Sequence, residues 1–152
     1  MSWETPKTNW AIHLDSAGNY EGDFFNAYDY NRIKNNLLYI RDLAIQIYGV
    51  VPEIVVGPDK YEIDVWEPNW ENDNYFAWEF NAIEDGIETL GELMDFVDIG
   101  DKKTFYDNGR FIDYVELNRL ESALLKMYNV LSSAISHKSR LAFRLGAGKF
   151  KI

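Results

Sequence analysis

The sequence predicts a mainly α-helical protein with minor β structure: a three-helix bundle of repeated amphipathic helices, with one or two small β-hairpins and a C-terminal β-like extension. Three observations lead to this fold class. One helical pattern occurs three times, the apolar period switches to two around two short turns, and the final stretch alternates. We expect residues 1–138 to form one helical-bundle domain with hairpin insertions, and 139–152 a basic docking extension.

The three helical segments align on Asn31, Asn81 and Asn118. Relative to each of these residues, apolar side chains recur at positions −1, +2, +6, +9 and +13. The first set is Tyr30, Ile33, Leu37, Ile40, Ala44, the second Phe80, Ile83, Ile87, Leu90, Met94, and the third Leu117, Leu120, Leu124, Met127, Leu131. Spacings of three and four residues place each set on one face of a helix. The pattern therefore predicts amphipathic helices over 26–48, 77–96 and 113–136.

Two of these helices begin with a capping signal. Asn26 and Asp113 lie five residues before the shared Asn, and each is followed three positions later by an acidic residue, as in a capping box. The middle segment has Phe76 at this position, which is not a capping residue. Gly86 and Gly91 weaken the middle helix further, by about 1 kcal/mol each relative to alanine.

The shared Asn lies off the apolar face, roughly 140° from its centre at about 100° per residue. On the first helix, Asp29 and Arg32 are expected to point outward with it as an exposed pair that contributes only a few tenths of a kcal/mol. That pair does not account for the Asn, which is a mediocre helix former. Our hypothesis is that the amides of Asn31, Asn81 and Asn118 bind the backbone of a neighbouring loop or subunit.

Between the helices the apolar period becomes two. Ile54–Val56, a turn at 57–60 and a second run at Tyr61–Trp66 together predict a β-hairpin. The sequence Asp107-Asn108-Gly109 between short apolar runs predicts a second tight turn or small hairpin.

The end of the chain alternates large and small or polar residues. Leu141, Phe143 and Leu145 alternate with Ala142 and Arg144, which predicts a strand followed by a glycine-hinged extension. Such a strand would add to the sheet edge of a neighbouring protein, with Leu141, Phe143, Arg144 and Leu145 as contact residues.

Charge is unevenly distributed along the chain. All 25 acidic residues lie in 1–121, whereas 122–152 carry six basic residues and no acidic one. An acidic body repels phosphate, which argues against nucleic-acid binding, and the basic tail suits an acidic protein surface. The chain has no cysteine, no signal peptide and no apolar run of about 18 residues, so we expect a soluble protein made in a cytoplasm, without membrane partners.

No pattern indicates catalysis, a cofactor or a metal site. His13 and His137 are far apart in sequence and in no zinc-binding spacing, and LGAGKF near the C-terminus lacks the spacing of a phosphate loop. Trp66 and Trp70 lie in a polar loop and are candidates for contact with a partner or a sugar. Two alternatives to a structural role stay open: a non-catalytic module for cell-wall saccharide, and a glycan-cleaving enzyme that uses two acidic residues.

Five stretches, taken in order, resemble a family of small phage proteins: WETPKTNW, DFFNAYDYNRIKNNLLYI, FNAIEDGIETL, KTFYDNGRFIDYVELNRLESALLKMY and RLAFRLGAG. Members of this family are encoded among the tail and baseplate genes of phages and prophages of Gram-positive bacteria. The resemblance covers almost the whole chain and is weakest at 49–75; the chain departs from it at the missing cap before Ala77 and at the close AGKFKI.

The resemblance implies a virion component of the tail tip or baseplate, made in the host cytoplasm and assembled with other tail proteins. It brings no enzymatic residues. A small, aromatic-rich, cysteine-free domain with repeated helices agrees with this role. We therefore expect a homo-oligomeric assembly protein, with a host-surface saccharide as an alternative partner.

Overall fold

A computed structural model describes residues 2–11, 14–19, 22–61, 75–94, 97–109 and 111–144, with side chains through His137. Its described part is mainly helical, with α1 (Ala27–Tyr48), α3 (Ala77–Leu93) and α4 (Tyr114–Arg144). Each helix packs against the other two, so the three form one bundle. The predicted helical bundle is thereby confirmed, and the starts of α1, α3 and α4 fall within one residue of the expected ones.

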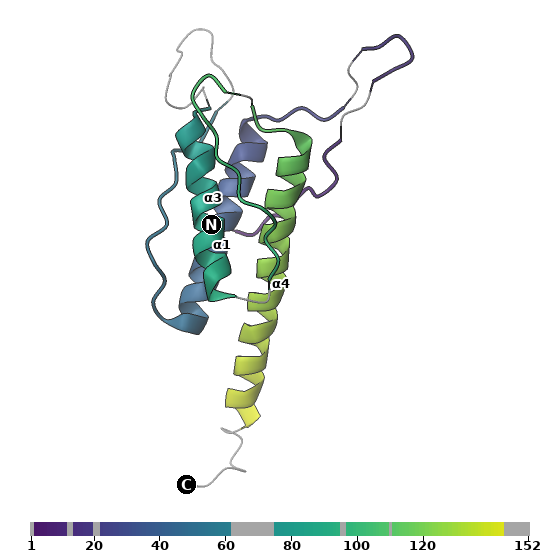
Figure 1. The fold of residues 1–152 in the computed structure, drawn as a ribbon. Helices are drawn as coiled ribbons and strands as arrows, with labels where there is room; N and C mark the ends of the chain where they lie inside the picture. Colours follow the sequence, from purple (N-terminus) through teal and green to yellow (C-terminus); the bar gives the residue numbers. More distant parts are fainter. Residues whose placement is uncertain are drawn as a thin grey trace.

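The three helices run in the same direction, as Figure 1 shows. The chain runs back toward the starting end twice, in residues 49–61 and 97–109, along the outside of the bundle. Parallel packing explains these long connections, since a short loop would join antiparallel neighbours. Helix α4 continues alone well beyond the ends of α1 and α3 (Figure 1).

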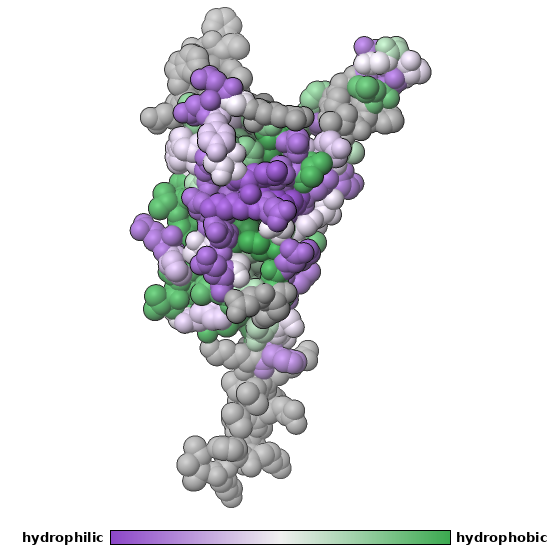
Figure 2. Space-filling model, viewed as in Figure 1, coloured by the Kyte–Doolittle hydropathy of each residue, from purple (hydrophilic) through white to green (hydrophobic). Residues whose placement is uncertain are grey.

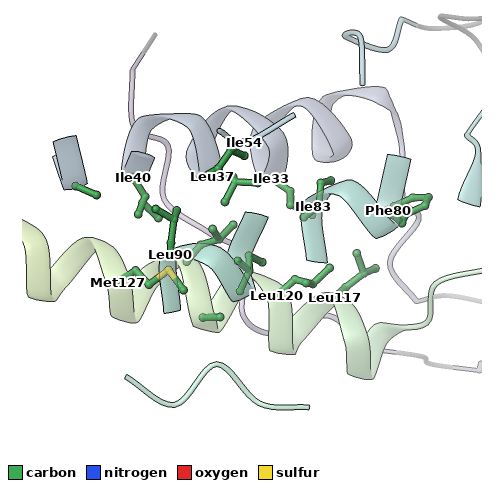
Figure 3. Close-up of a cluster of buried hydrophobic side chains, with 14 of the residues drawn as sticks. Ile33, Leu37, Ile40, Ile54, Phe80, Ile83, Leu90, Leu117, Leu120 and Met127 are labelled. Carbon is green, nitrogen blue, oxygen red and sulfur yellow. The ribbon is translucent and has the colours of Figure 1, made fainter. Parts of the chain in front are cut away.

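The core consists of five layers, each with one residue from every helix segment. All fifteen residues of the repeated apolar pattern are buried, and none is more than 4% exposed. In Figure 3, Ile40, Leu90 and Met127 lie together at one end of the cluster, and Phe80 and Leu117 at the other. Residues at the same position of the three repeated patterns thus lie at the same level along the bundle axis. This arrangement requires parallel helices in register.

Helix capping follows the sequence. The Asn26 side chain accepts from the N–H of Asp29, and the Asp29 carboxylate accepts from the N–H of Asn26. Asp113 accepts from the N–H of Glu116 at the start of α4. At the start of α3, Phe76 offers no side-chain cap, and its N–H instead donates to Glu79 at 3.3 Å.

The β-hairpins are not found in the part of the chain that the structure describes. Residues 51–61 are irregular, and 62–66, the rest of the first hairpin, lie outside the described residues. Pro52 and Pro58 have no N–H to donate to a strand ladder, which disfavours pairing there. The turn at 106–109 is present, with Gly109 N–H donating to the Tyr106 carbonyl at 2.9 Å and Asn108 at φ 60°.

The strand expected at Leu141–Leu145 is a second difference. Helix α4 continues through Leu141, Phe143 and Arg144, so the backbone of this stretch is helical rather than extended. No glycine or proline occurs between Tyr114 and Leu145 to end the helix earlier. The alternation of apolar residues at its end was therefore misleading.

Candidate functional site

Each of the three shared Asn side chains holds one residue of a neighbouring segment by both of its backbone polar groups. The Asn31 amide donates to the carbonyl of Lys60 and accepts from its N–H, each at 2.7 Å. Asn81 makes the same two bonds with Phe105, at 2.9 and 2.7 Å. Each side chain thus satisfies one donor and one acceptor of an irregular segment, as a strand partner would.

The third Asn does the same with the N-terminal segment. Asn118 donates to the Trp10 carbonyl at 2.9 Å and accepts from its N–H at 2.7 Å. A further pairing holds the same N-terminal segment against α1. There the Asn36 amide donates to the Glu4 carbonyl at 2.8 Å and accepts from its N–H at 3.0 Å. The neighbouring loop of the sequence hypothesis is thus part of the same chain, and a role of these amides toward a separate partner stays a prediction.

The three pairings form a cycle. Helix α1 holds the segment that follows it, α3 holds the segment that follows it, and α4 holds the N-terminal segment in the equivalent place. Lys60, Phe105 and Trp10, hereafter the paired residues, therefore occupy equivalent positions. The body has approximate threefold internal symmetry, with a helix and an extended segment as its unit.

Ion groups with at least one fully buried carboxylate join the described helices, and at two of the three interfaces the cation is an arginine of a helix. Arg32 of α1 bonds to Glu121 of α4 at 2.8 and 3.0 Å and to Asp29 of its own helix at 2.9 Å. Glu121 also accepts from the Nε1 of Trp10 and from the N–H of Lys7. Burial alone would lower the pKa of Arg32, but the bonds to Glu121 and Asp29 outweigh it and raise that pKa. The prediction that Asp29 and Arg32 form an exposed pair was wrong, since both are buried.

The second interface repeats this group. Arg119 of α4 bonds to Glu116 of its own helix and to Glu84 of α3, as Arg32 does to Asp29 and Glu121. Burial raises the pKa of the Glu84 carboxyl, and the Arg119 guanidinium acts in the opposite direction. Gly100, at φ 74°, lets the Arg119 side chain cross the segment, because a Cβ there would lie 2.6 Å from it.

The third interface has a different arrangement of charges. Ala82 stands where the other two helices carry arginine, and Lys34 stands where they carry glutamate. Here Glu79 is fully buried and accepts from Lys60 Nζ at 2.7 Å and from the Tyr30 hydroxyl at 3.0 Å. The paired residue itself thus supplies the cation at this interface.

Tyr30 gives this interface a measurable dependence on pH. Burial, then the Glu79 charge, raises the pKa of its hydroxyl well above the usual value near 10. Above pH 10 the unfolded chain loses this proton and the folded one keeps it, so the free energy of unfolding falls as pH rises. The contribution is at most about 1.4 kcal/mol per pH unit. We expect Tyr30→Phe to lack this slope in urea titrations from pH 8 to 11.

The exposed Tyr106 offers the control for this measurement, because Tyr106→Phe leaves the buried hydroxyl in place. It is expected to retain the slope of the wild type. Parallel stability curves for the wild type and Tyr30→Phe above pH 10 would contradict the account.

The Asn pairings are expected to stabilise the fold. Replacement of Asn31, Asn81 or Asn118 by alanine leaves a backbone N–H and C=O of the paired residue without partners, at a cost of about 1–3 kcal/mol each. Urea unfolding measures the cost, and hydrogen exchange at the paired residue's amide should accelerate. Asn129→Ala, at an exposed position of α4, is the matched control. Unchanged stability in all three variants would contradict the role assigned to these amides.

Two aromatic-lined pockets open where the helices begin. The larger, about 480 Å³, lies at the start of α3, and the smaller, about 310 Å³, at the start of α4. The helix wall of the larger pocket is residues 75–77 and Phe80; that of the smaller is 112–114 and Leu117, at the same positions relative to the shared Asn.

The remaining walls also correspond. The paired residue and its successor form one wall: Phe105 and Tyr106 in the larger pocket, Trp10 and Ala11 in the smaller. The two residues before the N-cap of the next helix in the cycle form another wall, 111–112 in the larger pocket and 24–25 in the smaller. The two pockets are therefore internal repeats of one site.

Large apolar side chains are exposed in these pockets and elsewhere near the helix starts. We call this surface the aromatic end; it comprises Phe24, Tyr28, Tyr61, Phe76, Trp78, Tyr106, Phe111, Tyr114 and Val115. Beneath it, rings of Phe25, Tyr75 and Phe80 pack on one another and on Phe111 at centroid distances of 5.5–6.2 Å. Figure 2 shows that hydrophilic side chains instead gather across the middle of one side of the bundle. Among the described residues, the exposed aromatic side chains thus lie mainly where the helices start, whereas the exposed Val50, Ile45 and Tyr48 lie at the end of α1.

The other predicted site residues are placed differently. Trp66, Trp70 and Leu145 lie outside the described residues, as does His13, and His137 is exposed on α4. Leu141, Phe143 and Arg144 belong to the projecting end of α4. Across the described ranges, no group of histidine, cysteine, aspartate and glutamate side chains could hold a metal ion, and no helix is long and apolar enough to cross a membrane.

Sequence reasoning missed the pockets. Their signal is the aromatic or apolar pair before each N-cap, such as Phe24-Phe25 and Phe111-Ile112, which the helical pattern does not include. Comparison of the chain with protein-family models, curated proteins and solved structures finds no match.

Proposed function

We propose that the protein is a non-catalytic structural part of a bacteriophage virion that joins neighbouring proteins of the tail tip or baseplate. The observation that carries this proposal is the aromatic end. Exposed apolar patches on folded proteins mark interaction sites, and aromatic side chains are enriched where protein interfaces are tightest. The sequence resemblance to small proteins of phage tail and baseplate gene clusters supports the kind of assembly.

The rest of the body suits a rigid part. Among the described residues, no buried side-chain nitrogen or oxygen lacks a hydrogen-bond partner. The long segments are held to the helices by Asn31, Asn81 and Asn118, and they also bury apolar residues such as Trp10, Ile54 and Ile112 in the core. Such a body presents its end surfaces in a fixed geometry, which lowers the entropic cost of docking.

The projecting end of α4 is a second docking element in this proposal. The last core layer contains Leu131, so the end of α4, residues 139–144, lies beyond the layers that stabilise the body. In sequence, residues 139–152 are basic and include no acidic residue, which favours an acidic surface on a neighbouring tail protein or on another copy.

Deletion of residues 139–152 tests the docking role. We expect a truncated protein with unchanged circular dichroism and thermal unfolding that is absent from purified particles, because the core layers remain intact. A full-length variant with the residues of 139–152 in shuffled order is the control for composition and length. Incorporation of the truncated chain at the wild-type level would overturn the docking role. Absence of the wild-type chain from particles, by mass spectrometry, would overturn the virion assignment itself.

One observation favours a second candidate, a binding module for cell-wall saccharide. In the larger pocket, Asp107 and Asn108 lie next to the exposed ring of Tyr106, which combines a stacking surface with hydrogen-bonding groups. A glycan array with the wild type and Tyr106→Ala tests this function. Binding lost in the variant would favour the saccharide module, and absence of binding by the wild type would remove it.

A further inference from the structure

The three helices carry different residues at two positions near their starts, four residues apart. Position −3 from the shared Asn is Tyr28, Trp78 or Val115, and position +1 is Arg32, Ala82 or Arg119. On α1 an aromatic ring and a cation are both present, and the Arg32 guanidinium lies 5.7 Å from the centre of the Tyr28 ring. At these two positions α4 has only the cation, and α3 has only the ring.

A pocket of about 270 Å³ opens on α3 at the place of the missing cation, between the helix and residues 53–55. Trp78 and Ala82 both line this pocket, hereafter the Trp78 pocket, and Trp78 is 51% exposed. Among the described residues, no lysine or arginine lies over the Trp78 ring. The pocket thus offers the aromatic half of the α1 pair, with open space beside it instead of a guanidinium.

The charge around the Trp78 pocket favours a cationic occupant. Glu53 and Asp85 line it and are exposed, and no lysine, arginine or histidine is among the described residues that do so. Asp85 pairs with Lys102 at 2.6 Å, and Lys102 also pairs with Glu88, so this one cation is shared between two carboxylates. A guanidinium can stack on an indole ring and bond to a carboxylate at the same time. The pocket therefore suits an arginine side chain.

The end of α4 carries two arginines, Arg140 and Arg144, one turn apart on a helix that projects alone beyond the bundle (Figure 1). In the same chain they lie too far from the Trp78 pocket. Because the helices are parallel and in register, position 126 of α4 is level with Thr89, the pocket residue of α3 nearest the projecting end. From position 126 to Arg140 the helix axis rises about 21 Å, at ~1.5 Å per residue. These arginines can therefore enter the pocket only in another copy of the chain.

We propose that Arg140 or Arg144 of one copy inserts its guanidinium into the Trp78 pocket of a second copy. There it stacks on the indole ring and bonds to a pocket carboxylate, and so forms between two chains the pair that Tyr28 and Arg32 form within one. The inference rests on the docking role proposed for the end of α4, and it names a second copy of the chain as the receptor. The contact joins two different surfaces, so each copy carries one of each.

Sedimentation velocity of the purified full-length protein over a concentration series tests the proposal. We expect the wild type to associate as its concentration rises and to dissociate as salt is added, because salt screens exposed charges. Ala82→Arg supplies the cation within the chain, as Arg32 does beside Tyr28, and is expected to weaken association by about tenfold or more. Arg140→Gln/Arg144→Gln removes the occupant and should weaken association to a similar extent.

Two further variants separate loss of the contact from damage to the fold. Trp78→Ala removes the ring at an exposed position and should weaken association without adding bulk to the pocket. Tyr106→Ala removes an exposed ring from the larger pocket and is the control, with unchanged association expected. Circular dichroism of each variant verifies that the bundle is intact.

Engineered thiols can show which segments meet, because the chain has no cysteine of its own. Val55→Cys, at an exposed position of the Trp78 pocket, is mixed with Ser139→Cys under mild oxidation. We expect a disulfide-linked dimer of the two variants, and Ala82→Arg added to the Val55→Cys chain should prevent it. Tyr106→Cys, exposed in the larger pocket, replaces Val55→Cys in the control and should not form a mixed dimer.

The outcomes separate this contact from the proposed function. A wild type that stays monomeric throughout the series, or association that Ala82→Arg leaves unchanged, overturns the contact between copies. If chains truncated at 139–152 then still fail to enter particles, the docking role of the end of α4 stands, with another protein as its receptor. A monomeric wild type together with normal incorporation of the truncated chain would end both.

Discussion

We expect Glu121→Ala to lower the free energy of unfolding by about 3–5 kcal/mol, because it leaves the buried Arg32 guanidinium without its main partner. The carboxylate is fully buried and also accepts from Trp10 Nε1 and the Lys7 N–H, so the variant loosens the N-terminal segment too. Urea unfolding measures the change in stability. Hydrogen exchange at Trp10 measures the loosening.

A double variant separates the ion pair from the fold around it. In Arg32→Met/Glu121→Met both charges are removed, and we expect it to be more stable than Glu121→Ala alone, because no buried charge is left unpaired. Asp42→Ala removes an exposed pair with Arg41 and serves as the control, with an expected change within about 0.5 kcal/mol. An effect of Glu121→Ala as small as that of Asp42→Ala would show that this group contributes little.

Leu124→Ala is expected to cost about 2–5 kcal/mol, since it opens a cavity in the central core layer. Leu37 and Ile87 complete that layer, and all three are at most 1% exposed. Three parallel helices cannot close around the missing atoms without losing register in the neighbouring layers. Chemical denaturation with an unchanged m-value is the measurement.

Val115→Ala on the same helix is the control, because Val115 is 53% exposed. A change below about 0.5 kcal/mol is expected there. If Leu124→Ala were no more costly than Val115→Ala, the layered core would be wrong.

The helices and their core could be predicted because burial repeats every three or four residues in each segment. Tyr30, Phe80 and Leu117, for example, follow from spacing alone. The direction of the helices could not, since an amphipathic stripe is the same in parallel and antiparallel bundles. The only sequence feature that favours parallel packing is the length of the connections at 49–76 and 94–113, because parallel neighbours need a connection long enough to return along the bundle.

Polar residues were harder to place. Arg32 lies off the apolar stripe, and the sequence predicts a solvent-exposed side chain. In the fold the N-terminal segment covers Arg32, and Glu121 of α4 forms an ion pair with it. Both facts depend on contacts between residues far apart in the chain. The binding of backbone by Asn31 was foreseen because a mediocre helix former recurred without a helical reason; which segment it would bind was not.

Because Trp10 pairs with Asn118, the N-terminal segment can pack onto the bundle only late in synthesis. Residues 3–10 leave the ribosome well before α4, the helix that supplies Asn118 and Glu121 to them. Until then Trp3 and Trp10 lack the partners they contact in the finished fold, Tyr128 and Glu121. During synthesis these two tryptophans are therefore exposed until α4 is complete, so the yield of folded protein should depend on chaperones that shield them.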